Sequence, residues 1–454
     1  MLHMLTDLRF RNFKAWRDSG PIRLAPLTVL FGKNSAGKTS LAQLLLMLKQ
    51  TVESPDRQRA LQLGESRSLV DLGTYEDVVY NHDTTKALSI DLAWNSHKQG
   101  SFSATFRGNK LHQPRVERFE YKFDPYWYSL GAHKPGTIKK IGMRRLSNGK
   151  YELVPKGKYS PRNADAEVQL PGPAHFHAFP SEVSAYYQNI VFSSDLVLEF
   201  EKILRSIYYV GPLREYPKRL YLWAGEIPDH VGIKGEQVIP ALLAGRGRHY
   251  SLARTHRNES LMSLVGAELR RLGLISKLTV RSVREPRKEY EILVRSGFSL
   301  PEVKLTDIGF GVSQVLPVIV ECFYVPSNSI VLFEQPELHL HPKAQSELAD
   351  LFIDAIYAKE EGTPRNCQFI IESHSEHFLR RLQRRIAEEK LGSRDAALYF
   401  VHSRGGAARL EALEVDTYGN ILNWPEGFFG DEMEDLVARS EAQARRIAKE
   451  RGGE

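Results

Sequence analysis

Cysteine is scarce in this chain, which has two in 454 residues, Cys322 and Cys367. Each lies beside an apolar run, so we interpret both as buried thiols and expect neither a disulfide framework nor a cysteine-rich metal site. Long apolar runs are also missing, since none approaches the ~20 residues of a membrane span. The first residues lack the charged and apolar regions of a secretory signal. These absences predict a cytoplasmic protein without a membrane partner.

Internal repeats, long heptad runs and low-complexity linkers are absent too, which argues against a solenoid or a coiled coil. A length of 454 residues is long for one core, and a prior of about 150 residues per domain predicts two or three units. The composition is ordinary for a globular protein, with 42% hydrophobic and 26% charged residues. The net charge of +7 is compatible with a nucleic-acid partner but does not require one.

The strongest motif present is the segment 32–39, GKNSAGKT, which fits the phosphate-loop pattern G-x-x-x-x-G-K-[ST] at every fixed position. An apolar run at 27–31 predicts a strand before it, and 40–48 predicts a helix after it. Such a loop turns its N–H groups toward phosphate oxygens, and the helix N-terminus adds partial positive charge. We therefore predict ATP binding by Gly32, Lys33, Asn34, Ser35, Ala36, Gly37, Lys38, Thr39 and Ser40, with the Thr39 hydroxyl on Mg²⁺.

The chain between the loop and residue 300 has a different pattern. Residues 4–13 and 22–24, near the N-terminus, predict strands. Alternating runs at 88–94, 102–106 and 115–123 predict a β-meander, and 181–206 is patterned as helix. Residues 139–162 carry eight basic side chains against one acid, Glu152. That stretch could follow a DNA or RNA backbone, but a solvated hairpin face explains it at least as well.

Two later segments resemble further parts of a nucleotide site. Residues 307–314 form a glycine turn that opens an apolar helix, which is an anion-binding arrangement, and its candidates are Gly309, Gly311 and Ser313. Residues 329–334 form an apolar strand that ends in Glu334, where an acid would lie beside the Mg²⁺ water shell. Gln335 follows this acid directly, and Glu337 lies two residues further on.

A third segment, 368–375, is an apolar strand that runs into Ser373 and His374. A lone histidine would be interpreted as a surface residue. Its position after the phosphate loop, the glycine turn and the acidic strand favours a functional role for His374.

The four motifs, from the phosphate loop through the glycine turn and the acidic strand to the histidine, occur in the same order as in ABC-type ATPases. Nearly the whole chain resembles one group of these ATPases. The NFK strand at 12–14, VGPLR at 210–214 and PELHLHP at 336–342 are similar to the SMC, RecF and OLD group, and to stand-alone antiphage-defence ATPases such as the PtuA-like ATPases of Septu. The resemblance implies an α/β ABC-type P-loop head, a mixed sheet flanked by helices plus an N-terminal β-ribbon, with an inserted β-rich and helical region.

The resemblance also implies roles. Glu334 and Thr39 would hold Mg²⁺, the former through water, and His374 would touch the γ-phosphate. Gly309, Gly311 and Ser313 would contact ATP held by the opposite subunit of a dimer. Such heads carry a glutamate as general base where this chain has Gln335, which can orient water but cannot accept its proton. Glu337 is the alternative, so the catalytic candidates are Glu334, Gln335, Glu337 and His374.

The resemblance predicts three regions: the N-terminal half of the head at 1–85, the insertion at 86–300 and the C-terminal half at 301–454. Too few residues follow His374 for the nuclease domain of OLD proteins, so an effector nuclease would be separately encoded. The expected function is an ATPase that dimerises around ATP and controls that effector in antiphage defence. The alternatives are a nucleotide-gated scaffold with negligible hydrolysis and a RecF-type DNA-repair ATPase.

Overall fold

The computed structural model describes residues 4–425, 437–443 and 446, apart from 66–67, 96–98, 110–112, 125–137, 160, 163–167, 255–256, 285–287 and 298–299. Within these residues, no helix combines the length and the apolar character that crossing a membrane requires.

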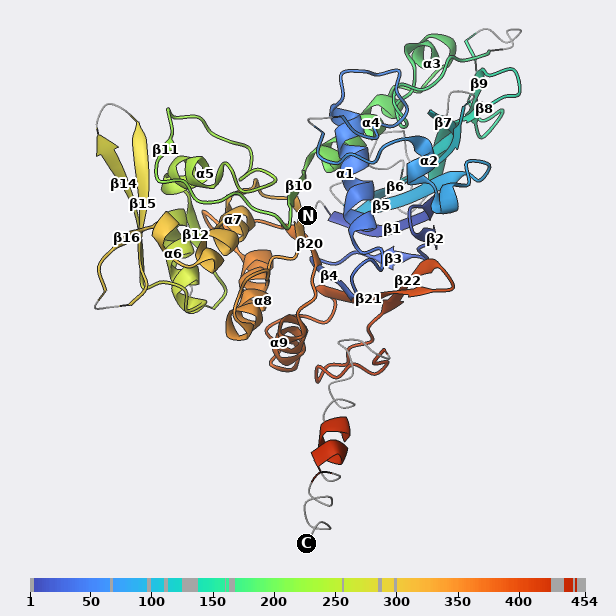
Figure 1. Ribbon diagram of the computed structural model, residues 1–454. Helices are drawn as coiled ribbons and strands as arrows, with labels where there is room; N and C mark the ends of the chain where they lie inside the picture. Colours follow the sequence, from blue (N-terminus) through green and yellow to red (C-terminus); the bar gives the residue numbers. More distant parts are fainter. Residues whose placement is uncertain are drawn as a thin grey trace.

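A six-stranded sheet forms the centre of the molecule (Figure 1). Its strands, in spatial order, are β10 (Ile207–Val210), β17 (Ile330–Glu334), β20 (Gln368–Glu372), β4 (Leu27–Gly32), β21 (Ala396–Arg404) and β22 (Ala407–Ala412). All neighbours are parallel except the hairpin of β21 and β22. The carboxyl ends of β17, β20 and β4 therefore meet at one edge, where an α/β sheet binds its ligands.

The strands β4, β17 and β20 are buried on both faces, which explains why they are continuous apolar runs and not alternating ones. Along β4, Leu30 packs into one core, whereas Val29 and Phe31 pack into the other. The helices α1 (Thr39–Glu53) and α4 (Phe192–Arg205) belong to the first core. The second core contains α7 (Phe310–Tyr324), α8 (Pro342–Tyr357) and α9 (Glu376–Ala387). This arrangement confirms the predicted α/β class, with a mixed sheet between two layers.

The predicted N-terminal strands and the β-meander come together in one antiparallel sheet. In spatial order it contains β2 (Trp16–Asp18), β1 (Met4–Phe13), β5 (Leu88–Asn95), β6 (Gln99–Gly108), β7 (Pro114–Phe123), β8 (Lys139–Arg145) and β9 (Tyr151–Val154), with β3 (Ile22–Arg23) paired to β1. Strict burial alternation along β5 turns one face toward α4. Because β1 pairs with β5, the sheet crosses the boundary expected at residue 85, and the three-region division stays a prediction.

The remaining elements lie mostly beside α7 and α8, on the left of Figure 1. One small sheet contains β11 (Tyr221–Leu222), β15 (Glu289–Arg295), β14 (Lys277–Arg284) and β16 (Val303–Lys304). A second small sheet contains β13 (Asn258–Ser260), β12 (His249–Ser251), β18 (Lys359–Glu360) and β19 (Thr363–Pro364). The other helices are α2 (Tyr75–Val78), α3 (Ser181–Tyr186), α5 (Val238–Ala244) and α6 (Leu261–Arg271), with 3₁₀ turns at Tyr80–His82, Gly245–Gly247 and Leu305–Asp307.

Acid is expected to destabilise the first core through His177. This side chain is fully buried, and its Nε2 lies 3.1 Å from Oε1 of Glu201 on α4. Burial lowers the pKa of His177 below its usual value near 6.5. The unfolded chain therefore binds more protons than the native protein as pH falls below about 6.5, and native stability drops by up to about 1.4 kcal/mol per pH unit.

Denaturant unfolding between pH 7.5 and pH 5 would measure this loss. The His177→Gln variant should lose this part of the pH dependence, whatever its absolute stability. His249→Gln changes a histidine whose side chain is 44% exposed and should keep the wild-type slope. An unchanged slope in His177→Gln would assign the acid sensitivity to other groups.

Candidate functional site

The phosphate-loop segment leaves β4 at Gly32 and enters α1 at Thr39. Gly32 has a φ of +145°, and a side chain there would overlap the carbonyl of Val401 on β21. Gly37 has a φ of +100°, with the Trp16 ring directly against it. The Trp16 indole Nε1 donates to the Gly37 carbonyl at 3.0 Å. Both glycines are therefore required by their surroundings as well as by the motif.

Lys38 lies folded within its own loop. Its ammonium donates to the carbonyls of Gly32 at 3.0 Å and Lys33 at 2.7 Å, and its side chain is almost fully buried. It also lies 3.8 Å from Oε1 of Glu372. Burial lowers the pKa of Lys38, while the carboxylate of Glu372 opposes that shift. A buried cation in a loop that opens a helix N-terminus is suited to bind a polyphosphate.

Two carboxylates meet at the edge of the sheet. Glu334 ends β17 and Glu372 ends β20, and the two residues are register partners in the parallel pair. Burial, followed by the charge of Glu372, raises the pKa of Glu334 to about 7. Burial also raises the pKa of Glu372, against the effect of Lys38. A nearby cation would stabilise the ionised form of such buried acids most strongly.

Hydroxyl groups complete this cluster. Thr39 Oγ1 donates to Oε2 of Glu372 at 2.9 Å, and the Tyr209 hydroxyl donates to Oε1 of Glu334 at 3.1 Å. Two carboxylates and a threonine hydroxyl are hard oxygen ligands of the kind that Mg²⁺ prefers. The donor set therefore fits the predicted Mg²⁺, with Glu372 added to Thr39 and Glu334.

Glu372 and Tyr209 were missed by the sequence analysis. Glu372 has the same local signal as Glu334, because each is a carboxylate at the end of an apolar strand. Tyr209 is an aromatic residue within a short strand, and nothing local indicates its contact with Glu334, which lies 125 residues away.

Gln335 occupies a tight turn after β17. Its φ is +44°, a conformation that non-glycine residues adopt rarely. Its backbone N–H donates to the Glu372 carbonyl at 2.9 Å. His339 in the same turn also has a positive φ, +64°. Backbone strain of this kind gathers at functional sites, and here it follows the acid that we expect to hold Mg²⁺.

Glu337 braces the segment that carries His374. Its Oε1 accepts from the Ser373 hydroxyl at 2.8 Å and from the His374 N–H at 2.7 Å. Burial raises the pKa of Glu337. Burial, followed by the charge of Lys38, lowers the pKa of His374. The imidazole, which lies near the phosphate-loop lysine, is therefore in its neutral form.

The glycine turn at 309–313 begins α7. Gly309 precedes the helix, and the Ser313 hydroxyl donates to the Phe310 carbonyl at 2.8 Å. A side chain at Gly311 would press on the carbonyl of His339, and the Phe310 ring lies 5.1 Å from the His339 ring. The turn thus packs on the 335–341 loop. Contact of Gly309, Gly311 and Ser313 with a partner's ATP stays a prediction.

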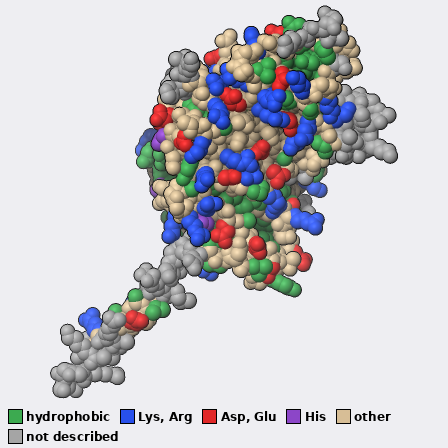
Figure 2. Space-filling view, turned by 90° about the vertical axis from the view of Figure 1, so that its right-hand side faces the viewer, with side chains coloured by type: hydrophobic (Ala, Val, Ile, Leu, Met, Phe, Trp, Pro, Cys, Tyr) green, Lys and Arg blue, Asp and Glu red, His purple; other side chains and the backbone are tan. Residues whose placement is uncertain are grey.

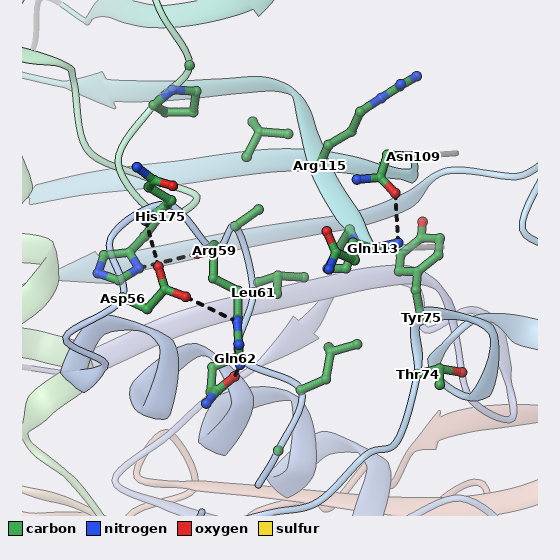
Figure 3. Close-up of a pocket in the computed structure, with 18 of the residues that line it drawn as sticks. Asp56, Arg59, Leu61, Gln62, Thr74, Tyr75, Asn109, Gln113, Arg115 and His175 are labelled. Carbon is green, nitrogen blue, oxygen red and sulfur yellow. Dashed lines mark hydrogen bonds and ion pairs between the residues drawn. The ribbon is translucent and has the colours of Figure 1, made fainter. Parts of the chain in front are cut away.

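A separate cavity of about 650 Å³ lies between the 56–75 segment, the start of β7 and the 172–175 segment (Figure 3). None of its lining residues belongs to the phosphate loop. Polar groups in its wall bind one another: the Asn109 side chain accepts from the Gln113 N–H at 3.0 Å, and Arg59 lies 3.5 Å from Asp56. We assign this cavity no part in nucleotide binding.

The basic segment 139–162 does not present an uninterrupted positive surface. Arg144 pairs with Glu152, and Lys140 lies 3.8 Å from Glu120 on the neighbouring strand. Figure 2 shows Lys and Arg side chains spread over one face of the molecule with acidic side chains between them. This mixture favours the solvated-face interpretation over a track for a nucleic-acid backbone.

Residues 261–380 match the family described as "AAA domain, putative AbiEii toxin, Type IV TA system", and residues 391–438 match a family described only as a protein of unknown function (DUF3696). The first match includes the glycine turn, Glu334 and His374. No curated protein matches the chain significantly.

Three solved structures are similar over most of the chain. An SMC head bound to the C-winged helix domain of ScpA has 12% identity, a TM-score of 0.41, and coverage of 91% of this chain and 98% of that chain. The SMC head domain from Thermotoga maritima has 11% identity, a TM-score of 0.40, and coverage of 90% and 99%.

The third is the Smc head domain with an extended coiled coil, bound to the C-terminal domain of ScpA derived from Pyrococcus furiosus. It has 11% identity, a TM-score of 0.41, and coverage of 91% and 97%. We base no inference on these three similarities, because their TM-scores are low. The strand order and the phosphate loop show an α/β P-loop fold, and residues 261–380 of that fold match an AAA domain.

Proposed function

We propose that this chain is a Mg²⁺-dependent ATPase that dimerises around ATP and controls a separately encoded effector nuclease in antiphage defence. The observation that carries the proposal is the single cluster of Lys38, Thr39, Glu334 and Glu372 at the edge of the sheet, where three strands end. A phosphate loop whose lysine and threonine already contact the buried acid Glu372 is suited to a metal–triphosphate complex.

The roles follow from the geometry. The loop amides and Lys38 would bind the phosphates, and Thr39, Glu334 and Glu372 would hold Mg²⁺ directly or through water. Bound Mg²⁺ would neutralise charge that develops on the phosphates. The Gln335 amide would orient the attacking water, and neutral His374 would donate a hydrogen bond to the γ-phosphate. Glu337 would fix the position of His374 from behind.

A nucleotide-gated scaffold with negligible hydrolysis is the second candidate. Gln335 favours it, because an amide cannot accept the proton of the attacking water. In such a protein, ATP would hold the dimer together, and the effector would respond to its loss. A RecF-type DNA-repair role is less favoured, because acidic side chains lie beside the basic residues of the segment 139–162.

The self-association of Gly309 variants tests the proposed contact between this turn and the ATP held by the other subunit. A Cβ added there meets nothing within 4 Å, so Gly309→Ala and Gly309→Asp should both fold. The aspartate would face the γ-phosphate held by the other subunit, and like charges disfavour the contact. We expect Mg²⁺–ATP to dimerise the wild-type protein, with at least about tenfold weaker dimerisation in the Gly309→Asp variant.

Light scattering with ATP, with ADP and without nucleotide would measure the mass, and Gly309→Ala is the matched control. Unchanged dimerisation of the Gly309→Asp protein would rule out contact of this turn with the partner's ATP. The defence role is tested by phage plating on the native host with Lys38→Ala in the chromosome. Equal plating on wild-type and variant cells would argue against it.

A further inference from the structure

Arg214 reaches the candidate site from a distant part of the chain. It follows β10, whose neighbour in the central sheet is β17. The path beyond Val210 brings its guanidinium to the turn after β17, where Nη2 donates to the Glu334 carbonyl at 3.2 Å. The Gln335 carbonyl lies 3.5 Å from the same nitrogen. One side chain therefore contacts both backbone carbonyls at the acid and the residue after it.

Two other nitrogens of Arg214, Nε and Nη1, have no hydrogen-bond partner among the residues that the structure describes. The side chain is 5% exposed, and both of these nitrogens are buried. Burial lowers the pKa of Arg214 to about 10, while the carboxylate of Glu337 opposes that shift, so the guanidinium is charged at neutral pH. Burying a cation with unpaired donors costs folding free energy. Such groups are rare in native proteins, and each calls for an explanation.

The backbone of Gln335 is held on both sides. Its N–H donates to the Glu372 carbonyl, and its own carbonyl faces Arg214. Between these two contacts the residue keeps a φ of +44°, which is unfavourable for a side chain of this kind. The backbone conformation determines where the Gln335 amide can point. Arg214 and Glu372 together therefore fix the direction of that amide.

We propose that Arg214 is a positioning residue that holds the Glu334–Gln335 turn in its left-handed conformation, so that the Gln335 amide orients the water attacking ATP. This proposal rests on the proposed ATPase function. Arg214 acts through the backbone of Gln335 and not on the nucleotide itself. Lysine would keep the charge but not the rigid planar guanidinium, whose Nη2 contacts both carbonyls.

The first test is spectroscopic and needs no turnover. In protein labelled with ¹⁵N-glutamine, the backbone amide resonance of Gln335 is assigned by its loss in Gln335→Ala. We expect Arg214→Lys and Arg214→Met to shift or broaden this resonance while most other glutamine resonances stay in place. Lys218→Met is the matched control, because Lys218 lies in the same segment and its side chain is 52% exposed.

The second test is a double-mutant cycle in ATP turnover. Arg214→Lys should lower kcat by about 10- to 100-fold, since small misplacements at a reacting centre reach 10²-fold. The Kd for Mg²⁺–ATP should stay within about threefold. In the Gln335→Ala background, Arg214→Lys should have little further effect on kcat, because both changes remove the same positioned amide.

The outcomes separate the two proposals. If the wild type shows no turnover, the ATPase proposal fails, and the Gln335 resonance alone decides the role of Arg214. If the Gln335 amide resonance does not move in a folded Arg214 variant, the positioning role is overturned. It is also overturned if the effects of Arg214→Lys and Gln335→Ala on kcat are independent and multiply. If neither Arg214 variant folds, Arg214 is a structural residue and the proposal is rejected.

Discussion

The Lys38→Ala protein is expected to bind ATP at least about 100-fold more weakly than the wild type. The ammonium already lies within the loop, where it contacts the Gly32 and Lys33 carbonyls and Glu372. Exchanging these contacts for two phosphates adds charge-assisted hydrogen bonds, each contributing about 1.5–3 kcal/mol. Since 1.4 kcal/mol is tenfold in affinity, losing two such bonds corresponds to about 10²–10⁴-fold.

Titration calorimetry with Mg²⁺–ATP would measure the affinity, and thermal unfolding would verify that the variant folds. Lys33→Ala is the matched control, because Lys33 lies in the same loop with an exposed side chain and removes the same charge. It should bind within a few fold of wild type. Equal loss in both variants would mean that net charge in the loop, and not the position of Lys38, determines affinity.

Local patterns predicted the parts of this protein that depend on near neighbours. The phosphate loop, the apolar strands at 27–31, 330–334 and 368–372 and the helix after the loop agree with the structure, because periodicity and glycine spacing act over a few residues. The meander strands were predicted for the same reason. Their pairing with β1 in one sheet was not predicted, because it joins strands that lie about 80 residues apart in the sequence.

Contacts over long sequence separations were not predictable. Thr39 and Glu372 are 333 positions apart, and Arg214 is 120 positions from the turn it holds. Nothing local in the segment 210–214 indicates that Arg214 contacts the backbone carbonyls of Glu334 and Gln335. Glu337 was considered as a base, and its orientation toward Ser373 and His374 could be learned only from the fold.

The Gln335→Glu protein is expected to hydrolyse ATP about 10²-fold faster than the wild type. Glutamate has the length of glutamine and would occupy the same strained turn, so the backbone contacts to Glu372 and Arg214 should persist. A carboxylate can accept the proton of the attacking water, and general bases contribute about 10²–10⁴-fold. Two buried acids nearby, Glu334 and Glu372, would raise the pKa of the new carboxyl toward neutrality, which suits a base at pH 7.

Steady-state turnover of the wild type, Gln335→Glu and Gln335→Ala separates the two proposed functions. Tight ATP binding with almost no wild-type turnover, restored by Gln335→Glu, would identify the natural chain as a clamp that ATP keeps closed. Wild-type turnover in the usual range of ~1–10³ per second, lost in Gln335→Ala, would assign water positioning to the natural amide. A Gln335→Glu protein no faster than Gln335→Ala would exclude this position from proton transfer. Glu337 could then act only by leaving its contacts with Ser373 and His374, which makes Glu337→Gln the decisive variant.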